Sequence, residues 1–116
     1  MDYIQREVDQ CLILDIVEHQ YDYAKIQLLK HQVAELIHQG HSRIVLNLEK
    51  VAMLDSFGIA AIISMLKQCQ AAGGNLALFG LNEGVNRLME LTRLDRVLEI
   101  WPTEAQAVMQ IKARKG

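Results

Sequence analysis

The chain has 116 residues, of which 51% are hydrophobic and 22% are charged, and its formal net charge is −2. This composition excludes a disordered tail and predicts one globular domain over residues 1–116, long enough to bury more than half of its unfolded surface. The small net charge gives no electrostatic reason to expect nucleic acid or an anionic membrane as a partner. A basic cluster at the end (Lys112, Arg114, Lys115) is interpreted as complementing the dipole of a terminal helix.

The first residues and the longest apolar run make a soluble, cytoplasmic protein the expectation. Met1-Asp2-Tyr3 is neither basic nor followed by an uninterrupted apolar segment, so no secretory signal is predicted. The longest apolar run, residues 59–66, contains Ser64 and is too short to cross a bilayer. Cys11 and Cys69 show neither a pairing pattern nor metal-ligand spacing, so we expect both to be buried or half-buried thiols.

The first part of the chain is expected to form a hairpin and then a helix. Residues 3–8 alternate imperfectly between apolar and polar, residues 11–17 are strongly apolar, and the connection between them is short enough for a hairpin. Asp22 offers an N-cap to a helix that Gly40 ends. The apolar residues at helical spacing are Ile26, Leu29, Val33, Leu36 and Ile37.

The middle of the chain is expected to form two buried strands joined by an apolar helix. Residues 44–48 and 76–79 are short, continuously apolar runs, which is typical of strands covered on both faces. Between them, helical spacing runs from Ser56 or Phe57 to about Ala72, where Gly73-Gly74 ends the helix.

The last third is expected to contain a helix, a short strand and a final helix. Asn82 is placed to cap the first of these helices, and residues 94–100 supply a fifth strand. The spacing of Thr103 and Gln106 is that of a capping box that opens the last helix. Strands that alternate with helices after a hairpin predict an α/β domain with a mixed sheet of about five strands, right-handed crossovers and four to five helices, the first three of which cover the sheet.

Asp55 and Ser56 are the first candidate site, because they lie where strand spacing gives way to helical spacing. A helix N-terminus has unpaired backbone N–H groups and favours oxygen acceptors, so either residue is suited to capping. Gly58, in the first turn, costs about 1 kcal/mol of helix propensity against alanine. The close approach of another chain or group would explain that glycine, although a simple cap and a tight bend would also account for the three residues.

One stretch of the chain resembles the signature of the STAS domain: Val51-Ala52-Met53-Leu54-Asp55-Ser56-Phe57-Gly58-Ile59. A buried strand precedes this stretch and an apolar helix follows it. The STAS domain is the fold of bacterial anti-sigma factor antagonists. Similarity extends over nearly the whole chain, to Tyr21-Asp22, to Gly80 after a strand and to residues 91–95. In that family a partner kinase phosphorylates the serine directly after the aspartate, which here is Ser56.

The resemblance implies a phosphorylation-controlled, partner-switching regulator. The unphosphorylated form would bind an anti-sigma factor or switch serine kinase and free the target of that kinase. Phosphorylation of Ser56 would end the binding, and a phosphatase of the PP2C type would restore it. The partner-facing residues implied are Asp22, Asp55, Ser56, Phe57 and Gly58, although Asp22 is equally well explained as an N-cap. The domain would use no cofactor, since ATP belongs to the kinase.

Three departures from the family pattern bear on partner choice. Phe57 replaces a second small hydroxyl residue, Asn47 stands in the middle of a strand where many members have aspartate, and residues 18–20 lack a glycine often found before the first helix. None of these removes the phosphoacceptor.

An enzyme is not predicted, because no nucleophile with a base, metal site or phosphate-binding loop is evident. The four histidines are interpreted as surface residues and not as metal ligands (His19, His31, His38, His41). Two other functions stay open. One is a scaffold subunit of a signalling assembly, which Phe57 and the very apolar central helix favour, and the other is a ligand or lipid-transport accessory domain.

Overall fold

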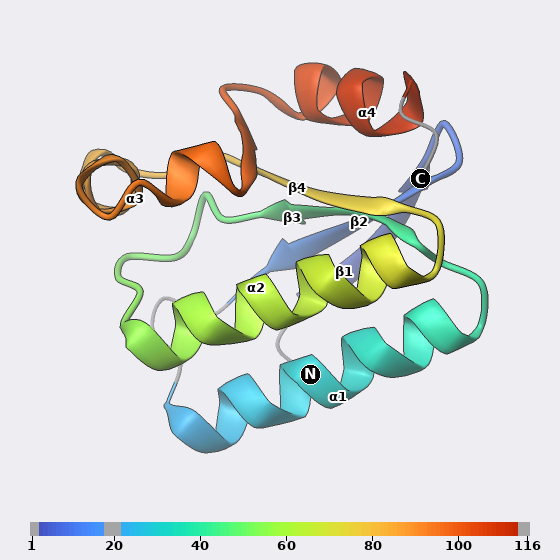
Figure 1. The fold of residues 1–116 in the computed structure, drawn as a ribbon, viewed down its shortest axis with the longest axis horizontal. Helices are drawn as coiled ribbons and strands as arrows, with labels where there is room; N and C mark the ends of the chain where they lie inside the picture. The colour runs from blue at the N-terminus through green and yellow to red at the C-terminus, as the bar shows by residue number, and fades with distance from the viewer. Residues whose placement is uncertain (1–2, 18–21, 114–116) are drawn as a thin grey trace.

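The computed structural model describes residues 3–17 and 22–113, which form a five-stranded mixed sheet with helices on both faces (Figure 1). The strands, in the order in which they lie in the sheet, are β1 (Tyr3–Val8), β2 (Cys11–Ile16), β3 (Arg43–Asn47), β4 (Asn75–Phe79) and β5 (Glu99–Trp101). β1 pairs with β2 in an antiparallel hairpin, and β2 to β5 are parallel to one another. The predicted α/β class, the mixed sheet and the hairpin are therefore confirmed.

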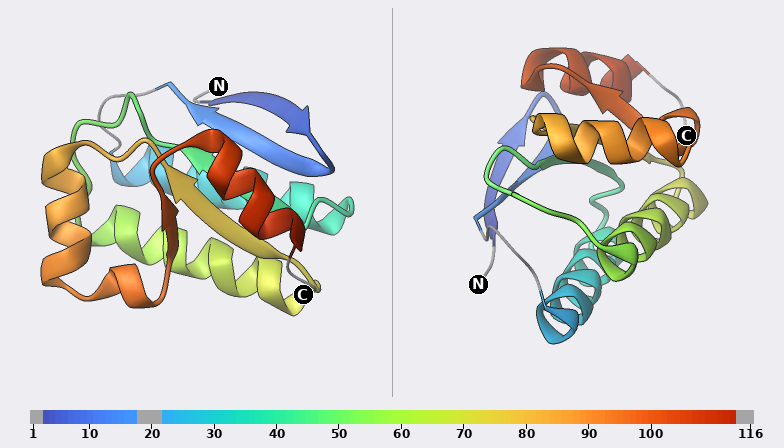
Figure 2. Two further views of the ribbon diagram at one scale, coloured as in Figure 1. Left: turned by 90° about the horizontal axis from the view of Figure 1, so that it is seen from above. Right: turned by 90° about the vertical axis from the view of Figure 1, so that its left-hand side faces the viewer.

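The helices lie on opposite faces of this sheet. They are α1 (Tyr23–His38), α2 (Ser56–Ala71), α3 (Glu83–Leu91), the 3-10 turn η1 (Leu94–Arg96) and α4 (Glu104–Ala113). α1 and α2 pack side by side on one face, while α4 crosses the other, as both views of Figure 2 show. The expectation that the first three helices cover the sheet is corrected in part. α4 covers the second face, and α3 lies where β4 leaves the sheet.

The middle of each central strand is apolar because its side chains fill two cores. Alternate residues of β2, β3 and β4 face α1 and α2, among them Leu14, Leu46 and Leu78, all at most 1% exposed. The intervening residues, such as Ile13 and Val45, pack against Ala107, Val108 and Ile111 of α4. Since a parallel sheet has helices on both faces, these strands are apolar on both sides along their middle, and the polar residues Asp15, Asn47 and Asn75 lie at or next to strand ends.

The hairpin turn consists of Asp9 and Gln10, whose φ angles are +49° and +70°. Two consecutive residues with positive φ match the right-handed twist of the flanking strands, and aspartate tolerates this conformation better than most residues. The turn sets the register in which Val8 lies opposite Cys11 and Ile4 opposite Asp15.

In the last third, the fifth strand differs from expectation and the cap of the last helix agrees with it. The fifth strand begins only at Glu99, because Arg93 adopts a left-handed conformation with φ +62° and the chain then makes the turn η1, leaving Val97 57% exposed. In α4 the Thr103 hydroxyl oxygen accepts the Gln106 backbone N–H at 3.2 Å, which confirms the cap. Apolar spacing alone could not predict that Val97 lies at the surface, outside the fifth strand.

Both cysteines are buried, as expected, and burial raises the pKa of the Cys69 thiol to about 12. Among the helices of the described ranges, none combines the length and the apolar character that a bilayer crossing requires.

Candidate functional site

Ser56 is the first residue of α2 and is exposed, while its neighbour Asp55 caps the helix. The Asp55 Oδ1 atom accepts the backbone N–H of Gly58 at 2.9 Å, and Asp55 itself has an extended backbone with φ −104°. This arrangement decides between the two capping candidates. Because Asp55 supplies the cap, the Ser56 side chain lies at the surface of the first turn.

A second helix N-terminus lies beside the first. Asp22 caps α1, with its Oδ1 atom accepting the Lys25 backbone N–H at 2.8 Å. The rings of Tyr23 and Phe57 join the two helix starts in an edge-to-face contact, with centroids 5.1 Å apart and planes at 81°. Asp22, Asp55, Ser56 and Phe57 are thus brought to one end of the molecule from positions more than thirty residues apart in sequence.

Three exposed apolar side chains belong to the two helix starts and to the segment before α2. Met53 is 65% exposed, Phe57 55% and Tyr23 58%. We define the Ser56 surface as Asp22, Tyr23, Met53, Asp55, Ser56 and Phe57. An exposed cluster of large apolar residues rimmed by carboxylates is typical of a protein interaction site and unusual at a surface that contacts only water.

Gly58 is buried, and the groups that approach it belong to this chain. A Cβ atom at this position would lie 3.2 Å from Leu54 Cδ2 and 3.9 Å from Ile26 Cδ1. The close approach expected from the sequence therefore comes from α1 and from the segment before α2. Gly58 lies beneath the Ser56 surface.

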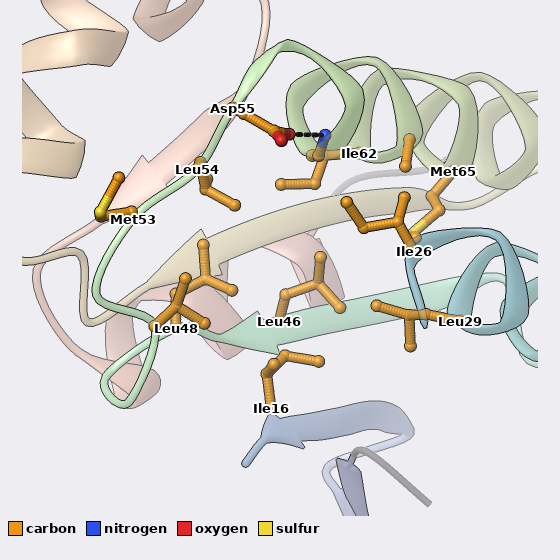
Figure 3. Close-up of a pocket in the computed structure, with 13 residues that line it drawn as sticks. Ile16, Ile26, Leu29, Leu46, Leu48, Met53, Leu54, Asp55, Ile62 and Met65 are labelled. Atoms are coloured by element: carbon orange, nitrogen blue, oxygen red, sulfur yellow. Dashed lines mark hydrogen bonds between the residues drawn. The ribbon is translucent and has the colours of Figure 1, made fainter. Parts of the chain in front are cut away.

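An apolar cavity of about 50 Å³ lies below the same surface, between α1, α2, the end of β3 and residues 51–55 (Figure 3). We call it the subsurface cavity. Figure 3 shows Leu54 and Ile62 pointing into it from above, Ile26 and Leu29 from α1, and Leu46 and Ile16 from the sheet. Its complete lining is Ile16, Ile26, Leu29, Leu46, Leu48, Val51, Met53, Leu54, Asp55, Gly58, Ala61, Ile62 and Met65.

A polar network fixes the point at which β3 leaves the sheet. Asn47 is the last residue of β3, not its middle, and its Nδ2 donates to Asp15 Oδ1 at 2.8 Å. The Asn47 Oδ1 atom accepts the Glu49 backbone N–H at 3.0 Å. Asp15 also accepts two hydrogen bonds from Arg6, at 2.6 and 2.9 Å, and Arg6 reaches Glu104 of α4 at 2.5 Å. The loop that leads to Ser56 thus starts from an anchored residue.

Arg6, Asp15 and Glu104 were missed by sequence reasoning. A signal was present, because Asp15 is a carboxylate in an otherwise apolar strand and a partly buried charge needs a partner. With the hairpin register that places Asp15 opposite Ile4, Arg6 lies diagonally across from it. Glu104 gives no comparable signal, since it is 98 residues away from Arg6 in sequence.

The Arg6 hydrogen bonds hold the pKa of Asp15 below its ordinary value, and the Asn47 amide adds to this effect. The unfolded carboxyl has a pKa of about 3.9, so Asp15 stabilises the fold above that pH, and its contribution disappears as the pH falls through the lower folded pKa. We expect Asp15→Asn to lower the free energy of unfolding near neutral pH by about 1 kcal/mol, with the difference shrinking in acid.

Urea unfolding of wild type and Asp15→Asn at a series of pH values checks this prediction. Asp95→Asn, which neutralises an exposed carboxylate in η1, is the matched control and should leave the curve nearly unchanged. A stability difference for Asp15→Asn that stays constant down to strongly acidic pH would contradict the proposed linkage.

The three histidines in the described ranges neither line the subsurface cavity nor belong to the Ser56 surface. His31 and His38 are exposed and His41 is half-buried, while His19 lies outside the described residues, as do Tyr21 and residues 18–20. Over residues 3–17 and 22–113, no three His, Cys, Asp or Glu side chains are placed to share a metal ion.

Comparison with known proteins yields matches in both sequence and structure. The STAS domain family matches residues 3–107. A Thermotoga maritima protein described as a candidate anti-sigma factor antagonist is 35% identical over 80 residues, which are 69% of this chain and 71% of that protein. A crystal structure of such a protein from the same organism has a TM-score of 0.87 and 31% identity, covering 95% of this chain and 94% of the other.

The structure of the Bacillus cell fate determinant SpoIIAA in its phosphorylated form has a TM-score of 0.70 and 15% identity, covering 94% of this chain and 98% of the other. At that identity the likeness concerns the fold.

Proposed function

The chain belongs to the STAS domain family, and on that premise we propose that it is a partner-switching regulator controlled by phosphorylation of Ser56. The relatives are named as anti-sigma factor antagonists, so the family is regulatory and not catalytic. In the proposed cycle, the unphosphorylated form binds an anti-sigma factor or switch serine kinase and frees the target of that kinase. The kinase transfers phosphate from ATP to Ser56, and a phosphatase of the PP2C type removes it.

The observation that carries this proposal is that Asp55 caps α2 while the adjacent Ser56 is exposed. Asp55 makes the capping hydrogen bond, so modification of the exposed Ser56 hydroxyl breaks no hydrogen bond that the described structure uses for the fold. A phosphoserine carries roughly −1.5 to −2 charges, which a helix N-terminus tolerates. The domain is therefore expected to stay folded in both states, as a reversible switch requires.

The Ser56 surface supports the partner side of the proposal. A docked protein would contact the exposed apolar side chains of Tyr23, Met53 and Phe57. The same surface already carries two carboxylates, those of Asp22 and Asp55. A phosphate added there would be desolvated next to two carboxylates when the partner packs against it. Such a mismatch of charge in an interface costs several kcal/mol.

The test is phosphopeptide mapping of the protein from its own cells, with capture of the kinase by wild type and by Ser56→Ala. We expect phosphate on Ser56 and capture of the same kinase by both proteins. The proposed cycle would be refuted if Ser56 carried no phosphate under any growth condition and if neither wild type nor Ser56→Ala captured a kinase.

Phe57 is expected to anchor the partner. Truncation of an interfacial aromatic residue costs about 1–2 kcal/mol or more, so Phe57→Ala should weaken kinase binding about tenfold or more. The lost contact with Tyr23 should cost the fold only about 0.5–1.5 kcal/mol.

Met109→Ala is the control for Phe57→Ala, because Met109 is 64% exposed on α4, on the far face of the sheet. Titration calorimetry with the captured kinase compares the two variants. Equal affinities for Phe57→Ala and Met109→Ala would exclude Phe57 from the interface.

The scaffold alternative loses one of its two supports. The apolar character of α2 is accounted for within the domain, since Ala61, Ile62, Met65, Leu66 and Cys69 are all buried in its own core. Phe57 still fits either function. Size-exclusion chromatography separates the two, because a regulator that binds transiently elutes as a small protein and an assembly subunit does not.

A further inference from the structure

The subsurface cavity has a lining that suits an apolar ligand. Of its 13 lining residues, all but Asp55 and Gly58 carry apolar side chains. A single water needs about 10–15 Å³ and two to four polar partners, whereas this cavity has about 50 Å³ and one polar side chain. Water inside would leave most of its hydrogen bonds unmade, so the cavity favours a small apolar group.

The side chains around the cavity leave the space open and allow it to adapt. Gly58 contributes no side chain at the point where Leu54 and Ile26 converge, and a Cβ atom there would already touch both. Met53 and Met65 complete part of the lining. Because methionine is unbranched and flexible, these two residues can adjust the cavity to the shape of an occupant.

The cavity reaches the surface at a hydrogen-bond acceptor. Met53 and Asp55 are both exposed and both belong to the lining, so the opening lies beside Ser56. Figure 3 shows one oxygen of the Asp55 carboxylate bonded to the Gly58 backbone N–H. An ionised carboxylate has about four acceptor positions and no donor, so a ligand that meets it must bring a donor.

We propose that the subsurface cavity binds a small aliphatic molecule with a hydrogen-bond donor at one end. The aliphatic part, about four carbons if each takes the roughly 10–15 Å³ that one water-sized group needs, fills the space between α1, α2 and β3. The donor bonds to Asp55. A bound ligand holds Leu54 and Asp55 in place, and it thereby slows hydrogen exchange of the Gly58 N–H that Asp55 accepts. An effect on Ser56 phosphorylation rests on the proposed function, but binding itself does not.

The test is titration of the full chain with 1-butanol, observed by NMR of labelled isoleucine and methionine methyl groups. We expect saturable shifts of Ile26, Ile62 and Met65, with a dissociation constant on the order of millimolar for so few ligand atoms. Ile13 and Ile111, in the core on the far face of the sheet, are the internal control and should not shift. The Gly58 amide hydrogen should exchange several times more slowly in the saturated protein.

Two comparisons make the ligand class specific. 1,4-Butanediol should bind at least tenfold more weakly than 1-butanol, because its second hydroxyl would lie among apolar side chains without a partner. Ala61→Val, which fills part of the cavity, should weaken 1-butanol binding by a similar factor, whereas Ala60→Val, at the exposed neighbouring position of α2, should not. If Ala61→Val does not fold, Met65→Ala, which enlarges the cavity, should tighten binding.

Three results would overturn the assignment. One is equal shifts of the cavity methyls and the control methyls, and another is equal binding of 1-butanol and 1,4-butanediol. The third is movement of the cavity methyls on addition of the captured kinase with no response to 1-butanol, which would assign the cavity to an apolar side chain of the partner. None of the alcohol titrations uses the kinase, so they test ligand binding even if Ser56 is not phosphorylated.

Discussion

Ser56→Asp is expected to weaken binding of the partner kinase by on the order of a hundredfold to a thousandfold, which corresponds to about 3–4 kcal/mol. The new carboxylate would lie beside Asp55 and within the exposed apolar group of Met53, Phe57 and Tyr23. When the partner covers this group, water leaves and the added charge is desolvated near the Asp55 carboxylate. The fold should be nearly unaffected, because residue 56 is at a helix N-terminus, where negative charge is favourable.

Titration calorimetry with wild type, Ser56→Ala and Ser56→Asp measures this effect. Ser56→Ala should bind as wild type does, since no charge is added. Gln70→Glu is the matched control for charge, because it adds a carboxylate to an exposed residue near the other end of α2 and should change affinity little. Wild-type affinity in Ser56→Asp, together with a native circular dichroism spectrum, would show that charge at residue 56 does not control binding.

The helix starts were predictable from sequence because capping is a local interaction. Asp22, Asp55 and Asn82 each accept a backbone N–H from the residue three positions further on, at 2.8 to 2.9 Å. A hydrogen bond of that span depends on little beyond the residue type and the apolar spacing that follows. The central strands were predictable for a similar reason, since continuous apolar runs need two covered faces.

The features that were not predictable depend on residues far apart in sequence. Arg6 meets Glu104 only because α4 returns across the second face of the sheet, and Tyr23 meets Phe57 only because α1 and α2 start at the same end. The family resemblance placed Phe57 on the partner surface but gave no sign of this contact. The subsurface cavity is likewise a property of the packing of two helices on β3, and Gly58 alone did not reveal it.

Gly74→Ala is expected to lower the free energy of unfolding by about 3 kcal/mol or more, at the upper end of overpacking effects. A Cβ atom on Gly74 would lie 1.9 Å from the Ser42 carbonyl oxygen and 2.4 Å from its carbonyl carbon. Both atoms are backbone, so no side-chain rotation relieves the clash. The chain would have to separate the starts of β3 and β4, where the Asn75 N–H donates to that same Ser42 oxygen at 3.0 Å.

Gly84→Ala is the matched control for Gly74→Ala. Gly84 lies in the first turn of α3, and the nearest atom to its added Cβ would be Asn82 Oδ1 at an ordinary 3.5 Å. Alanine there should be neutral or stabilising by up to about 1 kcal/mol, because it has the higher helix propensity. Guanidinium unfolding of wild type and both variants measures these differences in the free energy of unfolding. A loss below about 1 kcal/mol in Gly74→Ala would mean that the strand starts yield easily, since overpacking of a rigid backbone contact costs more than that.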